Sequence, residues 1–259
     1  LIVDDGSVDN TEEIVKQWIE EKIIRIEYIK KENGGKASAL NTALDRITTK
    51  YLCCLDSDDY FYPDTVKSVL IQLDGISDIS ECCGILALRH RADGDVTGGV
   101  KIPKEYEYIT VADLFFKIGS RGEVICFYKK DIVTQYRFPV FQGEKFVSPS
   151  WMQYTLAKNY KFKTSWEKLC CCEYADDGLT KNKRKVIVNN PRGYTIIKRL
   201  AFEFADSIKP LIKNGIMYDC GCILAKDNDW LNNSPHKMLS LLLMPFGYLV
   251  YLTRFRKTR

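Results

Sequence analysis

An α/β fold, with a mostly parallel sheet flanked by helices and a helical C-terminal extension, is the fold class that this sequence predicts. Apolar runs alternate with helical patterns over residues 1–56, in the order strand, helix, strand, helix, strand, which is typical of a parallel sheet. The run at 51–55 has no polar alternation, as expected of a strand covered on both faces. With 259 residues, 46% hydrophobic and 28% charged, the chain has room for one large domain, 1–188, and an appendage, 189–259.

The N-terminal elements follow from local patterns. Residues 1–3 form an apolar strand that runs into an acidic turn, and residues 12–18 carry the spacing of a helix with one buried face. Residues 23–29 alternate as a strand, and 37–45 form a second helix. Because natural proteins seldom begin inside a core strand, we expect that the numbered chain lacks an N-terminal strand and loop.

A glycine pair before the second helix resembles a phosphate-binding P-loop only superficially. Gly34, Gly35 and Lys36 would supply the end of that motif. The Walker pattern also needs Gly five residues earlier and Ser or Thr directly afterwards, where this chain has Lys30 and Ala37. Two interpretations remain: a simple turn, or a flexible turn that places Lys36 and the start of a helix near a ligand crevice.

The chain is organised around residues 51–60, where an apolar strand stops at Asp56, Asp58 and Asp59. Ligands of open α/β sheets bind at the carboxyl ends of the strands, and a divalent cation carrying phosphate oxygens is the expected partner of clustered acids there. The sequence therefore predicts a nucleotide-diphosphate site, with a solvated loop or a helix N-cap as the alternative. An EF-hand is excluded, because the twelfth loop position requires Glu and here is Lys67.

The remaining elements are predicted from the same periodicities. Helices are expected at 65–73, 109–116, 151–158, 194–213 and 219–228, and strands at 85–88 and 169–174. A basic run lies between the last strand and the later helices and comprises Lys181, Lys183, Arg184 and Lys185. It would lie over phosphates, either of a donor or of a lipid-linked acceptor, or it would be a solvated helix end.

The C-terminal end combines an apolar stretch, 238–252, with four cations after it. Pro245 and Gly247 interrupt this stretch, and we expect it to be too short to span a bilayer comfortably. Leu and aromatic residues followed by cations suit a segment, 238–259, that lies in the membrane interface against anionic lipid. An ordinary packed helix or a homodimer contact is the alternative.

Charge and cysteine usage narrow the partners and the compartment. A net charge of +4, without a run of basic residues interleaved with aromatics, argues against nucleic acid as a partner. The ten cysteines include adjacent ones in apolar surroundings and no C-x-x-C spacing of a zinc site, so we expect buried thiols in a reducing compartment. The absence of a secretory signal pattern agrees with a cytoplasmic location, peripheral to the inner face of the cell membrane.

Three motifs together carry a family resemblance. They are Asp4-Asp5-Gly6-Ser7 with Asp9-Asn10-Thr11, then Asn33-Gly34-Gly35-Lys36 with Ala39-x-Asn41-Thr42-Ala43, then Asp56-Ser57-Asp58-Asp59. In this order and spacing the first 65 residues or so resemble the N-terminal half of family 2 glycosyltransferases, which have the GT-A fold and a DxD motif. The family's opening strand, with its Pro-x-Tyr-Asn-type loop, has no counterpart in the numbered chain.

The resemblance implies roles for individual residues. It implies that Asp4 or Asp5 hydrogen-bonds the nucleotide base and that Lys36 lies near the base or the phosphates. Asp56 would contact the ribose or the sugar. The metal, Mg²⁺ or Mn²⁺, would be held on the diphosphate by Asp58, with Asp59 as the alternative. A hard cation that keeps several waters needs only one or two protein carboxylates, which agrees with this assignment.

The resemblance also implies a general base near residue 150. Inverting transfer needs one carboxylate to take the proton of the acceptor hydroxyl. Many family members carry Glu-Asp at the start of the helix predicted here at 151–158, but this chain has Ser148, Pro149 and Ser150 there. Glu144 is the nearest carboxylate and is the predicted catalytic base; a loop glutamate paired with Lys145 is the alternative.

The resemblance therefore implies an inverting, metal-dependent hexosyltransferase. It would move a sugar from a nucleotide-diphosphate donor, with a UDP-sugar favoured, to a saccharide or lipid-linked saccharide. The tract at 176–182 resembles bacterial members that build surface polysaccharides, so capsule, exopolysaccharide or cell-wall glycan synthesis is the expected context. The alternatives are a non-catalytic glycosyltransferase-like scaffold subunit and a sugar nucleotidyltransferase, although the latter opens on a glycine-rich loop that this chain does not show.

Overall fold

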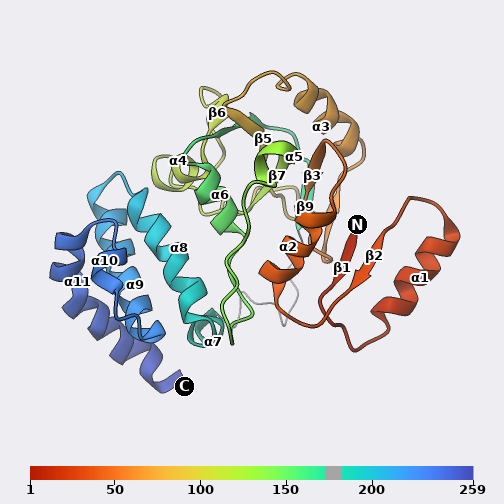
Figure 1. Ribbon diagram of the computed structural model, residues 1–259. Helices are drawn as coiled ribbons and strands as arrows, with labels where there is room; N and C mark the ends of the chain where they lie inside the picture. Colours follow the sequence, from red (N-terminus) through yellow and green to blue (C-terminus); the bar gives the residue numbers. More distant parts are fainter. Residues whose placement is uncertain (173–182, 259) are drawn as a thin grey trace.

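The computed structural model describes residues 1–172 and 183–258. The tract at 176–182, and Lys181 of the basic run, lie outside the described residues. Figure 1 shows three groups of elements: an N-terminal unit of β1, β2 and α1, a central sheet with its helices, and a helical bundle formed by α8 to α11. The predicted α/β class, with a central sheet flanked by helices and helices at the C-terminus, is confirmed.

The central sheet has five strands in the order β3-β7-β5-β8-β6. Their bounds are β3 (Tyr51–Cys53), β5 (Cys82–Leu88), β6 (Tyr108–Ile109), β7 (Val124–Lys129) and β8 (Lys161–Ser165). β5 lies in the middle and is buried along its whole length. It pairs antiparallel with β7, from Gly84↔Tyr128 to Leu88↔Val124, and parallel with β8.

The strand directions are mixed, and the expectation of a mostly parallel sheet is wrong. Among the described pairings β1/β2 and β5/β8 are parallel, whereas β3/β7, β5/β7, β6/β8 and β4/β9 are antiparallel. β4 (Asp59–Phe61) and β9 (Cys170–Cys172) form a separate two-stranded sheet. The alternation of strands and helices along the sequence shows which segments are extended, but it does not fix their partners, because Leu52 of β3 pairs with Tyr128 of β7, far along the chain.

Two hydrophobic cores lie on the two faces of the central sheet, because successive side chains of a strand point to opposite sides. Ile85 and Ala87 of β5 pack with Val69 and Leu73 of α3. Leu86 and Leu88 belong to the other core, which residues of α2, α4 and α6 cover. The helices around the sheet are α2 (Lys36–Arg46), α3 (Thr65–Asp74), α4 (Val111–Phe116), α5 (Lys130–Val133) and α6 (Ser150–Leu156).

The N-terminal unit contains β1 (Ile2–Asp4), α1 (Thr11–Glu21) and β2 (Tyr28–Lys30). β2 is shorter than predicted, because the alternating residues before it remain in a loop in which Ile23 is 81% exposed. Within the described residues β1 pairs only with β2, and β3 pairs only with β7. Being an edge strand, β3 is half-buried, so the expectation that both its faces are covered is wrong. The additional N-terminal strand stays a prediction.

The C-terminal helices form a bundle that joins the sheet domain through α8. Tyr154 of α6 and Leu200 of α8 share a hydrophobic cluster with Ala112 of α4. The bounds are α7 (Lys183–Asn189), α8 (Pro191–Glu203), α9 (Ile208–Ala225), α10 (Trp230–Asn233) and α11 (Lys237–Val250), which continues as the π-helical η1 (Tyr251–Phe255) and the short η2 (Arg256–Thr258). The proposed domain boundary between 188 and 189 falls in the last turn of α7.

Proline positions explain two differences from the predicted helices. The helix expected at 194–213 ends at Glu203, and α9 begins at Ile208, because Pro210 occupies the first turn of α9, where its missing N–H is not needed. In contrast, Pro245 does not break α11, and Lys237–Phe255 is one continuous helical segment. By length and composition alone this is the one helix among the described residues that could cross a membrane, which corrects the expectation that the stretch is too short.

Candidate functional site

A cavity of about 820 Å³ lies where the N-terminal unit faces the central sheet. Residues of β1, α1, α2, β3 and β7 line it, and most of them are apolar. Its polar end is formed by Lys36, Asp56, Asp59 and Arg89. The edges of β1 and β3 that lack a strand partner among the described residues border the same cavity. Its size lies within the range of small-molecule sites, in which a few convergent polar groups fix the ligand.

Lys36 and Asp56 meet at this polar end although 20 residues separate them. Lys36 is the first residue of α2, and Asp56 follows β3, so the start of a helix and the end of a strand face each other. The Lys36 ammonium forms a short ion pair with Asp56 Oδ1. Burial raises the pKa of Asp56, but Lys36 and Arg89 outweigh it and hold the pKa below its ordinary value. Asp56 is therefore an ionised carboxylate between two cations.

Arg89 completes the cluster and was not predicted from the sequence. It follows β5 directly; its Nε donates to the carbonyl of Val124 at 3.2 Å, and its Nη1 forms a short ion pair with Asp59 Oδ2 and a longer one, 3.4 Å, with Asp56 Oδ2. The Arg89 side chain is 11% exposed and that of Asp59 only 3%. The only available signal was a cation directly after a fully buried strand, which by itself is too common to indicate a site.

Asp59 is the carboxyl group whose ionisation the site perturbs most clearly. Burial raises its pKa to about 6 and outweighs the attraction of Arg89, while Asp56, Asp58 and Glu123 add to the increase. The structure directs this side chain toward Arg89, away from solvent. In this arrangement Asp59 does not offer an open ligand position to a cation.

Asp58 has the opposite environment. Asp58 is exposed in the turn between β3 and β4, and it forms no hydrogen bond or ion pair with another described residue. The described residues contain no group of three or more His, Cys, Asp or Glu that could hold a metal by themselves. The donor set therefore fits only a cation that takes most of its ligands from water and substrate phosphates, as Mg²⁺ usually does, with one carboxylate from Asp58.

Asp4 and Asp5, predicted to contact the base, both accept hydrogen bonds from the protein itself. Asp4 is buried; it accepts from the Ser7 amide at 2.7 Å and from the Tyr28 hydroxyl at 2.5 Å, and chiefly the latter lowers its pKa to about 2. Asp5 accepts from Lys31 at 2.8 Å and from the amides of Gly34 and Gly35 at 3.0 and 2.6 Å. Neither residue lines the cavity, and their base-binding role stays a prediction.

The glycine pair before α2 is a point of close backbone approach. Gly35 has φ +86°, and a Cβ at this position would lie 1.8 Å from the carbonyl oxygen of Lys145. Its amide is held by Asp5, so the turn is fixed between the N-terminal unit and the loop before α6. Asn41 ties α2 to the same loop by two hydrogen bonds to the backbone of Phe138, at 2.8 and 2.9 Å. The motif therefore positions Lys36 through backbone contacts.

Glu144, the predicted general base, lies elsewhere. Its two carboxylate oxygens accept from the backbone amides of Arg192 and Gly193, at 2.9 and 2.8 Å, in the first turn of α8. Its side chain is only 7% exposed, and the residue does not line the cavity. Asn190 adds to this connection by accepting from the amides of Lys145 and Phe146. The structure thus brings Glu144 together with the bundle and not with the aspartates; its catalytic role stays a prediction.

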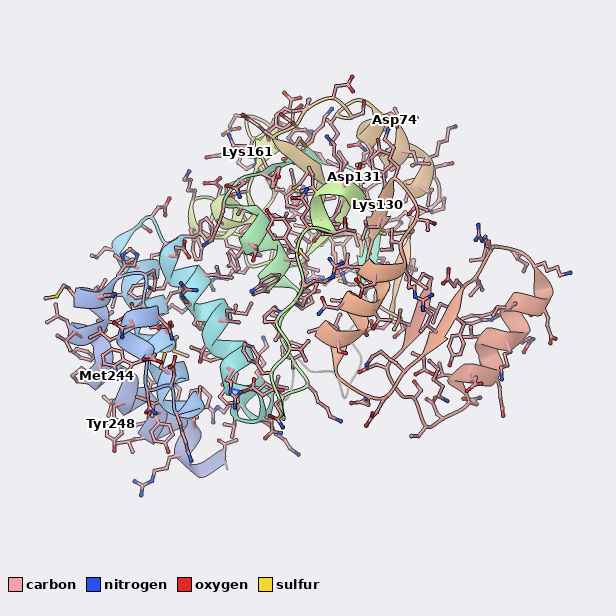
Figure 2. All side chains as sticks on the ribbon, in the orientation of Figure 1. Asp74, Lys130, Asp131, Lys161, Met244 and Tyr248 are labelled. Carbon is pink, nitrogen blue, oxygen red and sulfur yellow. The ribbon has the colours of Figure 1, made fainter. Side chains whose placement is uncertain are left out.

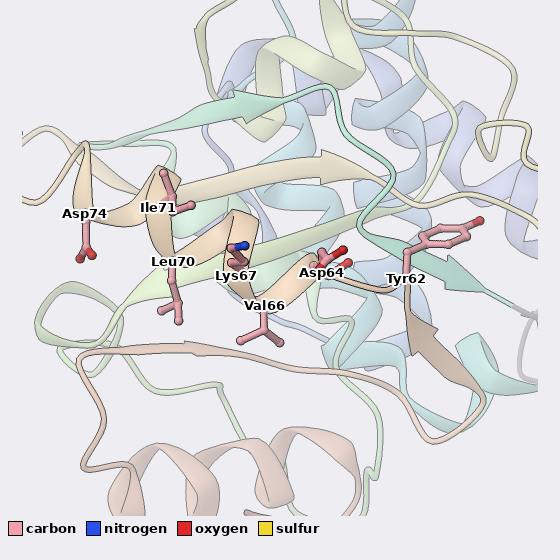
Figure 3. A pocket seen from close by; sticks show the side chains of 8 residues that line it. Tyr62, Asp64, Val66, Lys67, Leu70, Ile71 and Asp74 are labelled. Atoms are coloured by element: carbon pink, nitrogen blue, oxygen red, sulfur yellow. The ribbon is translucent and has the colours of Figure 1, made fainter.

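A second, shallower depression of about 670 Å³ follows the outer surface of α3 (Figure 3). Its lining combines apolar Val66, Leu70 and Ile71 with Asp64 and Lys67. None of the residues that the sequence predicts for the functional site lies there. The first cavity is therefore the candidate site.

Comparisons with known proteins agree with the fold and the motifs. Residues 1–137, more than half of the chain, match the model of a family described as "Glycosyl transferase family 2". An uncharacterized glycosyltransferase of Rickettsia felis is 42% identical over 67 residues, which are 26% of this chain and 11% of that protein. The glycosyltransferase GlyA of Streptococcus pneumoniae is 39% identical over 69 residues, which are 27% of this chain and 10% of that protein. The chain thus spans only a small part of these relatives' lengths.

Among solved structures, S. aureus TarS is similar over 99% of this chain and 48% of its own, with a TM-score of 0.55 and 14% identity. A TarS structure in complex with UDP-GlcNAc has a TM-score of 0.52 at 13% identity and covers 98% of this chain and 82% of its own. At such identities the likeness concerns the fold alone.

Proposed function

Because this chain belongs to glycosyl transferase family 2, we propose that it moves a sugar from a nucleotide-diphosphate donor to an acceptor hydroxyl, with inversion at the anomeric carbon. The observation that carries the proposal is the cluster of Lys36, Asp56, Arg89 and Asp59 at the polar end of the 820 Å³ cavity. Cations at the start of a helix and at the end of a strand suit a diphosphate, which prefers charge-assisted hydrogen bonds and helix N-termini.

Each residue of the site would have its own role in the transfer. Lys36 and Arg89 would neutralise the diphosphate of the leaving nucleotide, and Asp56 would hold both cations in place. Asp58 would hold Mg²⁺ or Mn²⁺, which as a Lewis acid stabilises the charge on the leaving diphosphate when it is bound. Asp59 would orient Arg89. The proton acceptor for the nucleophilic hydroxyl is, as a prediction, Glu144.

A UDP-sugar is the favoured donor, since UDP-GlcNAc is bound by a protein of the same fold. We place the acceptor among saccharides or lipid-linked saccharides of capsule, exopolysaccharide or cell-wall synthesis. A cytoplasmic site of action, at the inner face of the cell membrane, is supported by the ten unpaired cysteines, eight of which are buried. These thiols suit a reducing compartment.

The experiment is a calorimetric titration of the 259-residue chain with UDP, GDP and dTDP, with and without Mn²⁺. We expect one nucleotide to bind in a metal-dependent manner and Asp58→Asn to abolish the dependence on metal. Asp64→Asn is the matched control, because Asp64 is also exposed and lies six residues away on the α3 depression. Circular dichroism of both variants separates loss of binding from loss of fold.

The outcomes distinguish the alternatives. Metal-dependent binding together with slow hydrolysis of the matching sugar nucleotide supports a transferase. Binding without hydrolysis, and without transfer to any saccharide, supports the scaffold subunit. Formation of pyrophosphate from a nucleoside triphosphate and a sugar phosphate supports a nucleotidyltransferase. The absence of any nucleotide binding in a folded chain contradicts the assignment of the cavity.

A further inference from the structure

The outer face of α11 is apolar from Met238 onward. Six large apolar side chains on it are more than half exposed, from 52% for Leu241 and Tyr248 to 74% for Met238; the others are Leu242, Phe246 and Leu249. No Asp, Glu, Lys or Arg occurs between residues 238 and 253. Figure 2 places Met244 and Tyr248 at the outer edge of the bundle. Surface helices normally carry polar residues on this face, and a contiguous apolar patch marks an interaction site.

The opposite face of α11 fixes the helix to α9. Ser240 and Leu243 are buried, and a Cβ at Gly247 would lie 2.8 Å from Cβ of Asp219. Ser240 Oγ also hydrogen-bonds Ser234 Oγ at 2.7 Å. A helix held in this way presents its apolar side while it lies along the bundle. Crossing a bilayer would instead remove it from α9 and expose the buried Asp219 to lipid, which is costly.

Cations gather at the C-terminal end of the apolar face. Ile187 and Val188 of α7 share a hydrophobic cluster with Phe255 and Tyr251 of η1, so α7 is packed beside the end of the long helix. This packing brings the basic start of α7 to the same end as the basic residues of η1 and η2; the exposed cations are Lys183, Arg184, Lys185, Arg254 and Arg256.

The positive charge of the chain is also concentrated in its C-terminal part. Residues 183–259 carry 14 Lys and Arg against 5 Asp and Glu, whereas residues 1–182 carry 24 against 29. The C-terminal part therefore has a net charge of +9 and the remainder −5. An apolar face with basic flanks matches an anionic lipid surface, because the apolar side chains enter the acyl boundary while Lys and Arg reach the phosphates.

We propose that the outer face of α11 docks in the interface of an anionic lipid bilayer, with the exposed cations of α7, η1 and η2 directed toward lipid phosphates. The docking is peripheral, and it leaves α11 packed on α9. It does not depend on the proposed function, because nothing in the argument involves the cavity. The consequence for a glycosyltransferase is that its bundle, and not its sheet, holds it at the membrane surface.

The test is flotation of the 259-residue chain with vesicles of neutral phosphatidylcholine, and with vesicles that contain anionic phosphatidylglycerol. We expect binding to the anionic vesicles to be at least about tenfold tighter and to weaken with salt. Leu242→Gln/Leu249→Gln should reduce this binding by at least about tenfold. Arg254→Gln/Arg256→Gln should remove most of the preference for anionic lipid. A Leu242→Trp variant should shift its emission to shorter wavelength on anionic vesicles.

The matched control is Val66→Gln/Ile71→Gln on α3. These two apolar residues are 58% and 66% exposed, similar to 68% and 57% for Leu242 and Leu249, but they lie on the other depression (Figure 3). Vesicle binding should survive in this variant. Binding that survives in the α11 variant as well would overturn the proposal, as would no vesicle binding by the folded chain. Analytical ultracentrifugation that finds a dimer broken by Leu242→Gln/Leu249→Gln, without vesicle binding, would assign the face to a second copy and also overturn it.

Discussion

At the scale of single residues, Arg89 links the two carboxylates at the polar end of the candidate site. Among the described residues, its guanidinium is the cation that forms ion pairs with both Asp56 and Asp59. Because the Asp59 side chain is 3% exposed, removal of its partner leaves a buried carboxylate without compensation. Arg89 thus stabilises the fold, and in the proposed function it also provides a cation for the donor phosphates.

We expect Arg89→Met to lower the free energy of unfolding by about 3 kcal/mol, because an unpaired buried carboxylate costs on that order. Asp59→Asn in the same variant should restore most of this loss, but nucleotide binding should remain weak. Urea unfolding and calorimetric titration measure the two effects. Arg91→Met is the control, since Arg91 pairs with Asp93 and Asp95 at an exposed position and should cost less than about 1 kcal/mol. Equal losses in both variants would contradict the role of Arg89.

A second residue-scale prediction concerns the buried Asp219 beneath α11. The residue has no exposed surface, and neither carboxylate oxygen meets the geometry of a hydrogen bond with a described residue. Burial raises its pKa to about 7 and outweighs the neighbouring Ser240 hydroxyl, which lowers it. The carboxyl group of Asp219 therefore binds its proton more tightly in the folded chain than in the unfolded chain. The contribution of this group to the free energy of unfolding is present at low pH and is lost as the pH rises toward 7. The slope is roughly 1.4 kcal/mol for each pH unit in that window.

Asp219→Asn should therefore be more stable than the natural chain at pH 8, by roughly 2–4 kcal/mol, and should lose this part of the slope. Denaturant unfolding at pH 5, 6, 7 and 8 measures it. Asp206→Asn, at an exposed position in the same part of the chain, is the control for the loss of one carboxylate. If Asp219→Asn is less stable than the natural chain at pH 8, the ionised carboxylate stabilises the fold and the prediction is wrong.

At the scale of elements, the loop before α6 connects the N-terminal unit, the sheet domain and the bundle. It approaches the backbone of Gly35 on one side and carries Glu144 to the start of α8 on the other. Two predictions test these two connections separately.

Gly35→Ala should lower the free energy of unfolding by more than about 2 kcal/mol, because the positive φ and the contact with the Lys145 carbonyl both oppose a Cβ. Gly143→Ala is the control for conformation alone: Gly143 has φ +81° but no atom within 4 Å of the position that a Cβ would take, so about 1 kcal/mol is expected. Thermal unfolding compares the two variants. Similar costs would show that the close approach is unimportant.

Glu144→Ala should cost about 1–2 kcal/mol of stability, because the first turn of α8 loses an acceptor for two amides. If anchoring is its main role, kcat per folded molecule should change little, and Glu105→Ala, at an exposed position, should change neither quantity. A fall of kcat by a factor of about 100 or more in a fully folded Glu144→Gln variant would instead support the general base inferred from the family resemblance.

At the scale of the whole molecule, we expect the N-terminal unit to unfold locally more easily than the central sheet. β1 and β2 form their own sheet, and Asp5 with the Gly34–Gly35 turn is a main link to α2. Residues of both β1 and β3 line the cavity, so it lies between the unit and the edge of the central sheet. Few buried apolar contacts and open strand edges are features of regions that unfold locally at low free energy.

Hydrogen exchange should therefore be faster for the amides of β1 and β2 than for those of β5, by at least about 100-fold. UDP with Mn²⁺ should slow exchange in α1 and β1, since both elements line the cavity, and should leave α9 unchanged as an internal control. Protection of β1 equal to that of β5 in the free chain would show that the unit is part of one cooperative core.

The sequence by itself determined the α/β class, the positions of most elements and the family, because these depend on local periodicity and on motifs whose spacing lies within one short stretch. It also predicted that Lys36 and Asp56 belong to one site, since the end of a strand and the start of a helix are local features, and the structure places their side chains in contact. Only the tertiary structure decided strand directions, because β3 pairs with β7 far along the chain. It likewise introduced Arg89 into the site and paired it with Asp59, and it placed Glu144 at the start of α8. Pairings of this kind depend on contacts between residues that are distant in sequence, and no local pattern specifies them.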